Sequence, residues 1–451
     1  MDKNPAENIM GTAPVNRLLL SMSIPMMLSM MAQAFYNVVD SIFVSQVGAN
    51  ALTAVTLAFP VQMLMMGIGT GTGVGINALL SKSLGEKNPE MAQKSAVNGM
   101  FLIWISAAVF TVAGAFLSRW YFRVQTDIEE IVSMGGDYLF IVTVFSLGVF
   151  HQVTFERLLA STGKTFYAMV SQLGGTLINL ILDPILIFGF FGCPALGTRG
   201  AAIATVIGQF AAAGIGLYLH QTRNKEISMS FRRFKPQSGI IKQIYGIGLA
   251  SILMQSTGSI MNYGMNIILI AFTPVAAAVF GVFFKLQSFL FMPVFGLNNA
   301  MIPIIAYNYG ARSKARIVST IKLGVFYAAI IMVIGLSLFQ LIPDKLLLMF
   351  NADAEMLAIG VPALHILSII YIFAGAGLVG VSVFQALGSG LASLLVGIGR
   401  QLVVLLPAAY LLSLTGSVRA VWWSSPIAEL ATAVLCTVFF LGIYRQKIKP
   451  L

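Results

Sequence analysis

The amino-acid sequence predicts an all-α integral membrane protein with twelve transmembrane helices, arranged as two homologous six-helix lobes (a parallel repeat) around a central cleft. Three observations predict this fold class. The chain is strongly apolar, hydrophobic runs of membrane-spanning length recur along it, and features of its first half return 225 residues later. Together they exclude an ordinary water-soluble fold.

The hydrophobic content is too high for a water-soluble protein. Of the 451 residues, 58% are hydrophobic and 10% are charged, and the mean hydropathy is +0.88. A run of about 20 apolar residues crosses a hydrocarbon core of roughly 30 Å as a helix. We predict spans at residues 18–42, 51–80, 96–117, 132–154, 166–190, 200–219, 243–271, 276–306, 318–341, 358–383, 391–413 and 421–443. The first run is too long for a signal peptide and lacks a small-residue cleavage site, so we expect no cleaved leader.

The net charge of +11 follows the predicted topology. Between the spans, twenty Lys and Arg residues fall on the side of both termini and five on the opposite side. This asymmetry is the positive-inside pattern, which predicts a multi-pass protein of the cell (plasma or inner) membrane with both termini in the cytoplasm. Because the basic excess is explained by topology, we expect no nucleic-acid partner.

An internal repeat divides the chain into two halves. The segment GEKNPEMAQKSAVNG, residues 85–99, corresponds to GARSKARIVSTIKLG, residues 310–324, at an offset of 225. The same offset joins Gly163 with Gly388, Gly174 with Gly399, and Asn37 with Asn262. Such a set of matches indicates two homologous halves.

The repeat sets the predicted domain organisation. We expect an N-terminal lobe over residues 1–219, a polar cytoplasmic linker over 220–240 and a C-terminal lobe over 241–451. An even number of spans returns the chain to its starting side, so the two lobes share one orientation. Two such lobes that rock about a central cleft give alternating access, which favours a transporter.

The first span carries a carboxylate inside an otherwise apolar helix. An ionisable group at mid-membrane costs about 2.5 to 3.5 kcal/mol on insertion scales, so its presence needs a reason. Gln33, Tyr36, Asn37 and Asp40 lie at helical spacings and form a polar stripe. Pro25 precedes the stripe and removes a backbone hydrogen bond, which predicts either a hinge or a static kink.

The fifth span carries a matching stripe of Gln172, Thr176, Asn179 and Asp183. Asp40 and Asp183 lie at similar distances before external segments, so we expect both carboxyl groups at similar depth in one pocket. Burial and a second carboxylate nearby favour the protonated form, which predicts a proton site. A sodium site with Asn and Thr oxygens, and two acids buried for structural reasons, remain alternatives.

The second half lacks this carboxylate pair. The offset aligns Asp40 with Met265 and Asp183 with Ala408. Lys285 in the eighth span, Arg400 in the eleventh and Glu429 in the twelfth are charged residues of the second half without such a partner stripe. We expect these three to form a compensating buried pair or network, with a role in substrate binding or coupling as the alternative.

Abundant methionine and phenylalanine suggest an adaptable chamber. The chain holds 23 Met and 32 Phe, and such side chains suit a promiscuous apolar site as well as core or lipid-facing packing. The residues expected to line a substrate chamber are Gln33, Met63, Met66, Gln172, Thr176, Met261, Asn262 and Phe284.

These features together resemble a known family. Twelve spans in two halves, the paired loops LGEKNPEMAQKS and YGARSKARIVST, Pro25 and Asp40 in helix 1, and Asn179 and Asp183 in helix 5 resemble the multidrug and toxic compound extrusion (MATE) family across essentially the whole chain. The acids of helices 1 and 5 resemble its DinF-like branch.

The resemblance implies an antiporter that exports lipophilic organic cations in exchange for an inward-moving proton, with sodium as the alternative ion. In this branch a helix 1 aspartate is the proton-linked residue, a helix 5 asparagine and aspartate assist it, and a helix 1 proline marks a bend. By position these are Asp40, Asn179, Asp183 and Pro25. A helix 6 threonine completes the network, and either Thr205 or Thr198 fills that place. No cofactor or metal is implied, and we expect a monomer in the lipid bilayer.

Two other classes of function fit the sequence less well. A lipid-linked oligosaccharide flippase would favour a strongly cationic cavity to hold a pyrophosphate, and only Lys285 and Arg400 are expected as buried cations. An enzyme is not expected, because three His and two Cys show no metal-ligand spacing and no nucleophile–base constellation occurs.

Overall fold

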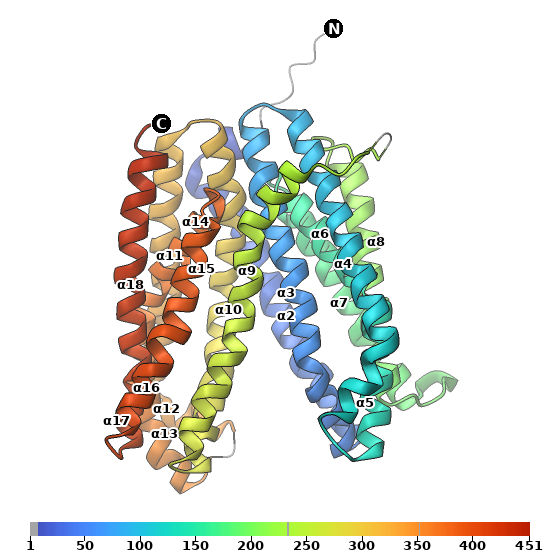
Figure 1. Ribbon diagram of the computed structural model, residues 1–451, viewed down its shortest axis with the longest axis vertical. Helices are drawn as coiled ribbons and strands as arrows, with labels where there is room; N and C mark the ends of the chain where they lie inside the picture. Colours follow the sequence, from blue (N-terminus) through green and yellow to red (C-terminus); the bar gives the residue numbers. More distant parts are fainter. Residues whose placement is uncertain (1–7, 232–233, 351) are drawn as a thin grey trace.

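The computed structural model describes residues 8–231, 234–350 and 352–451, with the side chain of Ser256 left out. Lys3, Arg232 and Arg233, three of the twenty basic residues assigned to the cytoplasmic side, lie outside these ranges. The described chain contains helices and connecting loops but no strand, and its long helices run side by side in two groups (Figure 1). The predicted all-α fold is therefore confirmed.

The first group of helices forms the N-terminal lobe. It comprises α2 (Val15–Val47), α3 (Ala49–Gly85), α4 (Pro89–Arg123), α5 (Glu129–Val144), α6 (Leu147–Ala160), α7 (Thr165–Phe188) and α8 (Thr198–Arg223). The short helices α1 (Ile9–Thr12) and η1 (Phe190–Gly192) flank it. The segment between α8 and α9 lies against α4, where Phe231 stacks on Trp104 at 4.9 Å between ring centroids.

The second group forms the C-terminal lobe. It comprises α9 (Ser238–Ile270), α10 (Pro274–Gly310), α11 (Lys314–Leu341), α12 (Pro343–Leu348), α13 (Ala354–Leu367), η2 (Ser368–Ile370) and α14 (Tyr371–Ala386). It continues with α15 (Gly390–Ile398), the π-helical segment η3 (Gly399–Leu405), α16 (Leu406–Ser413), α17 (Val418–Trp422), α18 (Ser424–Ile443) and η4 (Tyr444–Ile448).

The predicted number of spans agrees with the structure. Among the described residues, eleven helical segments are long and apolar enough to cross a membrane, and the bent pair α5 and α6 makes a twelfth. Several helices extend beyond the predicted ranges, because a helix continues past the hydrocarbon until a cap or turn ends it. For example, the span predicted over 51–80 is the helix Ala49–Gly85.

The fourth span differs from the single straight helix implied by the range 132–154. It bends by 46° between α5 and α6. At the bend, Thr111 of α4 donates its hydroxyl to the carbonyl of Val144 at 2.9 Å. A side chain that satisfies a helix carbonyl in this way allows a bend without proline. By contrast, α2 runs as one helix from Val15 to Val47 through the buried Pro25.

Both ends of the described chain lie at the same end of the bundle, which we call the terminus side. Arg316, at the start of α11, donates to the carbonyl of Met10 at 2.9 Å. Two residues earlier, Lys314 donates to the carbonyl of Lys449 at 2.9 Å. Both ends lie on one side because each lobe has an even number of spans. Figure 1 shows the end of the chain beside the α10–α11 turn.

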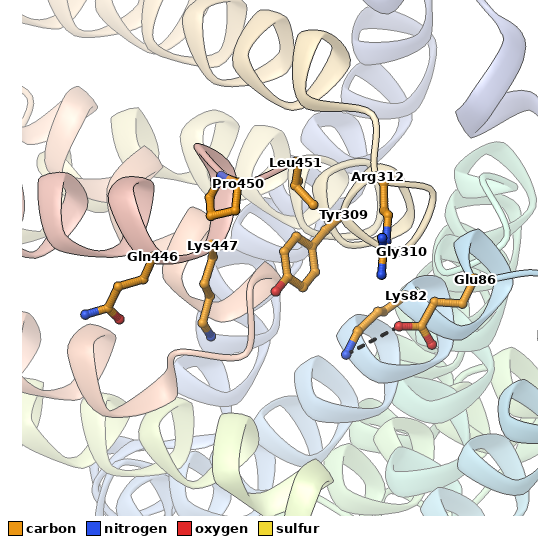
Figure 2. Close-up of a pocket in the computed structure, with 9 residues that line it drawn as sticks. All are labelled: Lys82, Glu86, Tyr309, Gly310, Arg312, Gln446, Lys447, Pro450 and Leu451. Atoms are coloured by element: carbon orange, nitrogen blue, oxygen red, sulfur yellow. Dashed lines mark ion pairs between the residues drawn. The ribbon is translucent and has the colours of Figure 1, made fainter.

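The two lobes meet through a pseudo-symmetric pair of glycine contacts on the terminus side. A Cβ atom on Gly85 would lie 1.9 Å from the carbonyl oxygen of Tyr307, and one on Gly310 would lie 2.2 Å from that of Lys82. The offset of 225 relates Gly85 to Gly310 and Lys82 to Tyr307, so the repeat also governs how the lobes touch. Figure 2 shows this seam, with Lys82 and Glu86 facing the segment around Tyr309 and Arg312.

Candidate functional site

Helices α2, α7 and α8 bring a group of polar side chains together inside the N-terminal lobe. We call this group the N-lobe polar cluster, and α7 packs between the other two helices that supply it. Its members are Gln33, Tyr36 and Asp40 of α2, Gln172, Asn179 and Asp183 of α7, and Thr205 of α8. Two stripes predicted from helical spacing thus face each other across one helix interface.

Direct hydrogen bonds connect the three helices. Gln172 donates its side-chain amide to the side-chain oxygen of Gln33 at 3.0 Å. The hydroxyl of Thr205 lies 3.3 Å from the hydroxyl of Tyr36 and accepts a hydrogen bond from the side-chain amide of Asn179 at 3.4 Å. Thr205 is therefore the hub that links α2, α7 and α8.

Glycines explain why α7 and α8 approach closely enough for these contacts. A Cβ atom on Gly175 would lie 2.5 Å from the carbonyl oxygen of Gly208. One on Gly208 would lie 2.7 Å from the Cβ of Asn179. With hydrogen in place of a side chain at both positions, the helix backbones touch and the short side chains of Asn179 and Thr205 can meet.

The two carboxyl groups lie in this cluster without a cationic partner. Asp183 is fully buried, and neither of its carboxyl oxygens has a hydrogen-bond partner within the described chain. One oxygen of Asp40 is buried and equally unpartnered there. The two groups interact electrostatically with each other, and no Lys or Arg in the described ranges forms an ion pair with either. A buried pair of this kind requires a proton or a bound cation.

The structure places the two candidate threonines differently. Thr205 lies in the cluster, whereas Thr198, at the start of α8, donates to the carbonyl of Met134 at 3.5 Å. Asn37, expected in the polar stripe, is exposed, and its backbone carbonyl accepts a hydrogen bond from Ser41. Thr176 is half-buried, on the same helix as Asn179.

Tyr138 of α5 was missed by sequence reasoning. It is 2% exposed, accepts a hydrogen bond from the side-chain amide of Gln62 at 2.9 Å, and interacts electrostatically with both Asp40 and Asp183. The local signal is a tyrosine directly after Asp137 in an otherwise apolar span. Its place beside the carboxyl groups depends on the packing of α5.

The C-terminal lobe contains a pocket of about 230 Å³, which we call the C-lobe pocket. Among its lining residues, Arg400 and Glu429 form an ion pair at 3.5 Å, as expected for a compensating pair. Lys285 takes no part, since its side chain is exposed and forms no ion pair within the described ranges. The three-residue network reduces to two members, because Lys285 faces away from the helix interface.

The eight residues expected to line one substrate chamber are divided between the lobes. Gln33 and Gln172 belong to the N-lobe polar cluster, whereas Met261 and Phe284 line the C-lobe pocket. The remaining four, Met63, Met66, Thr176 and Asn262, are half-buried. Both lobes therefore contribute residues to the expected chamber, which stays a prediction.

Comparison with known proteins agrees with this architecture. The model of the MatE family matches residues 25–185 and 250–433, one segment in each lobe. Multidrug export protein MepA of Staphylococcus haemolyticus is 26% identical over 440 residues, which cover 96% of this chain and 94% of that protein. An FAD transporter of Shewanella oneidensis is 25% identical over 425 residues, which cover 94% of each.

Solved structures show the same fold. The outward-facing conformation of a multidrug resistance MATE family transporter of the MOP superfamily superposes with a TM-score of 0.91 at 25% identity, covering 98% of each chain. This match extends over both lobes, and the family model covers well over half of the chain. The chain therefore belongs to the multidrug and toxic compound extrusion family, whose members are multi-pass membrane transporters and not enzymes.

Proposed function

We propose that this chain is a proton-coupled multidrug efflux antiporter that exports lipophilic organic cations by alternating access. The observation that carries the proposal is the buried pair Asp40 and Asp183, which lacks a cation within the described chain. Similarity to a multidrug export protein supports drug efflux, and the acids of α2 and α7 support assignment to the DinF-like branch.

The coupling mechanism follows from competition. With the cluster open to the outside, a proton binds to the Asp40 and Asp183 pair, reduces its negative charge and weakens its attraction for a cationic drug, which leaves. After the lobes rock, the proton dissociates inward, and the ionised pair attracts another cation from the cytoplasm or inner leaflet. A ligand shifts such an equilibrium only by its difference in affinity between the states, and the two fluxes are coupled through the same charge.

Neighbouring residues transmit the change. Protonation alters which partners hold the outer part of α2, where Tyr36 and Asp40 face Thr205 and α7. Pro25 gives this helix a weak point in its hydrogen-bond ladder, at which the outer part of α2 bends. Asn179 holds Thr205 in place while this happens.

The proposed orientation has both termini in the cytoplasm of a plasma-membrane monomer. The basic residues concentrated on the terminus side support it. The close inter-lobe contacts of Gly85 and Gly310 are on that side, which supports a conformation closed toward the cytoplasm.

Sodium is the second candidate for the coupling ion. The side-chain oxygens of Asn179 and Thr205 lie beside the carboxyl groups, and a hard cation binds such a set of oxygens. No further acid, His or Cys joins the two carboxylates within the described ranges to form a metal-binding group. A proton needs only one carboxyl oxygen, whereas a sodium ion needs several oxygen ligands.

The test is uptake of a fluorescent lipophilic cation into sodium-free proteoliposomes under an imposed pH gradient. We expect gradient-dependent uptake by the wild type and none by Asp40→Asn. The control is Asp344→Asn, which removes an exposed acid at the start of α12 and is expected to retain uptake. Wild-type uptake that begins only when sodium is supplied would assign coupling to sodium. Equal uptake by wild type and Asp40→Asn would give that residue a structural role.

A further inference from the structure

The C-lobe pocket lies at the place that Gln33 and Tyr36 of the N-lobe polar cluster hold in the other half, and the counterparts of the two acids do not line it. At an offset of 225, Gln33 corresponds to Gly258, Tyr36 to Met261 and Thr176 to Gln401. Gly258, Met261 and Gln401 all line the C-lobe pocket. The two sites are therefore related by the repeat, although one is filled by polar side chains and the other is open.

The missing side chain at the counterpart of Gln33 contributes to the open space. In the N-terminal lobe, Gln33 and Gln172 fill the interface between α2 and α7. Their counterparts are Gly258 and Gly397. At Gly397 the side chain of Met254 takes the space, 2.8 Å from where a Cβ atom would lie, whereas the space at Gly258 stays open. A Cβ atom on Gly258 would meet nothing closer than the side-chain oxygen of Gln401 at 4.0 Å. The pocket thus has room for a ligand where the other lobe has protein.

Aromatic side chains of α10 form one wall of the pocket. They are Phe280, Phe283, Phe284, Phe291 and Phe295. This wall is held from behind, since Phe283 packs edge-on against Phe339 and Phe291 against Tyr371, with ring centroids 5.7 and 5.8 Å apart. A supported aromatic wall of this kind is complementary to a flat aromatic ring system.

The polar part of the pocket carries one positive and one negative charge. Arg400 and Gln401 lie in the π-helical segment Gly399–Leu405, a type of irregularity found frequently at functional sites. Glu429, 5% exposed, approaches Arg400 through a single contact at 3.5 Å, longer than a normal charge-assisted hydrogen bond. The side-chain oxygen of Gln401 is buried and has no partner in the described chain.

Neither charge is a repeat of anything in the N-terminal lobe. Arg400 corresponds to Gly175 and Glu429 to Ala204. The pair is therefore specific to this lobe, and packing alone would be served better by apolar residues of similar size. Its loose geometry leaves hydrogen-bonding capacity on both side chains for a ligand.

We propose that the C-lobe pocket is a substrate subsite for planar aromatic zwitterions, which present a cationic group to Glu429 and an anionic group to Arg400. This inference rests on the proposed function in drug transport and names the class of substrate for one lobe. A simple cation would meet Arg400 and a simple anion would meet Glu429, whereas a zwitterion complements both. The aromatic wall takes the ring system.

A direct binding measurement tests the proposed zwitterion subsite without any ion gradient. The probes are 10-methylacridinium-9-carboxylate, a fluorescent zwitterion, and 10-methylacridinium, the matching monocation. Each is titrated against the purified full-length wild type in detergent, and binding is followed by fluorescence anisotropy. We expect the zwitterion to bind at least about tenfold tighter, the effect of one additional charge-assisted hydrogen bond. Equal affinity, tighter binding of the monocation, or no binding of either probe would overturn the proposal.

Three variants locate the site. Gly258→Gln restores the side chain of the N-lobe counterpart and is expected to weaken zwitterion binding at least about tenfold. Its matched control, Gly442→Gln, adds the same side chain where a Cβ meets nothing within 4 Å, and should bind as the wild type does. Arg400→Gln leaves Glu429 without its partner and should reverse the preference in favour of the monocation. Unchanged zwitterion binding in Gly258→Gln would place the ligand elsewhere and overturn the assignment.

The outcome is separable from that of the proposed function. Failure of proton-driven uptake with intact zwitterion preference would disprove coupling and leave the subsite supported. Proton-driven uptake of a lipophilic cation, without zwitterion preference in the binding titration, would overturn this inference alone. Folding of Arg400→Gln is checked with the double variant Arg400→Gln, Glu429→Gln, which leaves no charge unpaired and should bind both probes with similar affinity.

Discussion

The interiors of the two lobes differ in whether their charged side chains are paired, although the repeat gives them the same helix arrangement. In the N-terminal lobe, Gly175 lets α7 and α8 touch, and two acids lie nearby without a cation. In the C-terminal lobe, Arg400 stands where Gly175 would be and pairs with Glu429. An uncompensated acid pair is suited to bind a mobile ion, whereas a compensated pair beside an open pocket is suited to bind a neutral or zwitterionic ligand.

The two halves are equivalent at the contact between the lobes, where Gly85 and Gly310 correspond. Disrupting this contact should have the largest effect on transport. We expect Gly85→Val and Gly310→Val each to abolish drug transport, because either side chain would overlap backbone of the opposite lobe. The measurement is uptake in proteoliposomes, with Gly442→Val as a control in open space. Loss in one variant and full activity in the other would show that the two contacts are not equivalent.

Matched removal of one carboxylate from each lobe should lower stability only in the C-terminal lobe. Glu429→Gln leaves the buried end of Arg400 unpaired and should reduce the free energy of unfolding by about 1 to 3 kcal/mol. Asp183→Asn removes a buried acid that has no partner, and should leave the melting temperature unchanged or raise it. Thermal unfolding of the purified proteins in one detergent at neutral pH makes the comparison, and a similar loss in both variants would contradict it.

The hub of the N-lobe polar cluster should respond to loss of one hydroxyl. Thr205→Ala removes the group that contacts both Tyr36 and Asn179, and we expect about a threefold to tenfold lower rate of gradient-driven transport. Thr205→Ser keeps the hydroxyl and should retain most activity. Thr198→Ala lies outside the cluster and is the positional control. A larger loss of transport in Thr198→Ala than in Thr205→Ala would contradict the choice of Thr205 and give the helix 6 role to Thr198.

The smallest effect on stability is expected for substitution of Lys285 in α10. Lys285 is exposed and forms no ion pair in the described chain, so Lys285→Gln should change the free energy of unfolding by no more than about 0.5 kcal/mol. The zwitterion preference of the C-lobe pocket should also persist. A clear loss of that preference would mean that Lys285 reaches the pocket.

Much of the fold was predictable because its signals are local or periodic in the chain. Apolar runs mark spans wherever they occur, since the hydrocarbon core imposes one length on every helix that crosses it. The offset of 225 can likewise be read directly from the amino-acid sequence. It pairs Gly85 with Gly310, and both glycines lie at the contact between the lobes. The polar stripes on the first and fifth spans were visible for the same reason, as helical spacing alone brings Asp183 and Asn179 to one face.

Neighbours across helices were not predictable in this way. The choice of Thr205 over Thr198, the place of Tyr138 beside the acids, the bend between α5 and α6, and the exposure of Asn37 all depend on which helix lies opposite and how far it is rotated. Spacing in the sequence contains no such information.

The sequence by itself determined the membrane fold, the two halves and the acids on which ion coupling is proposed to depend. Each of these follows from the hydrophobic composition, the 225-residue repeat or the helical spacing of polar residues. Only the tertiary structure decided that Arg400 pairs with Glu429 while Lys285 does not, and that Gly258 leaves a pocket rather than a close helix contact. The physical reason is that these outcomes depend on distances between segments far apart in the chain, and packing of the whole lobe sets those distances.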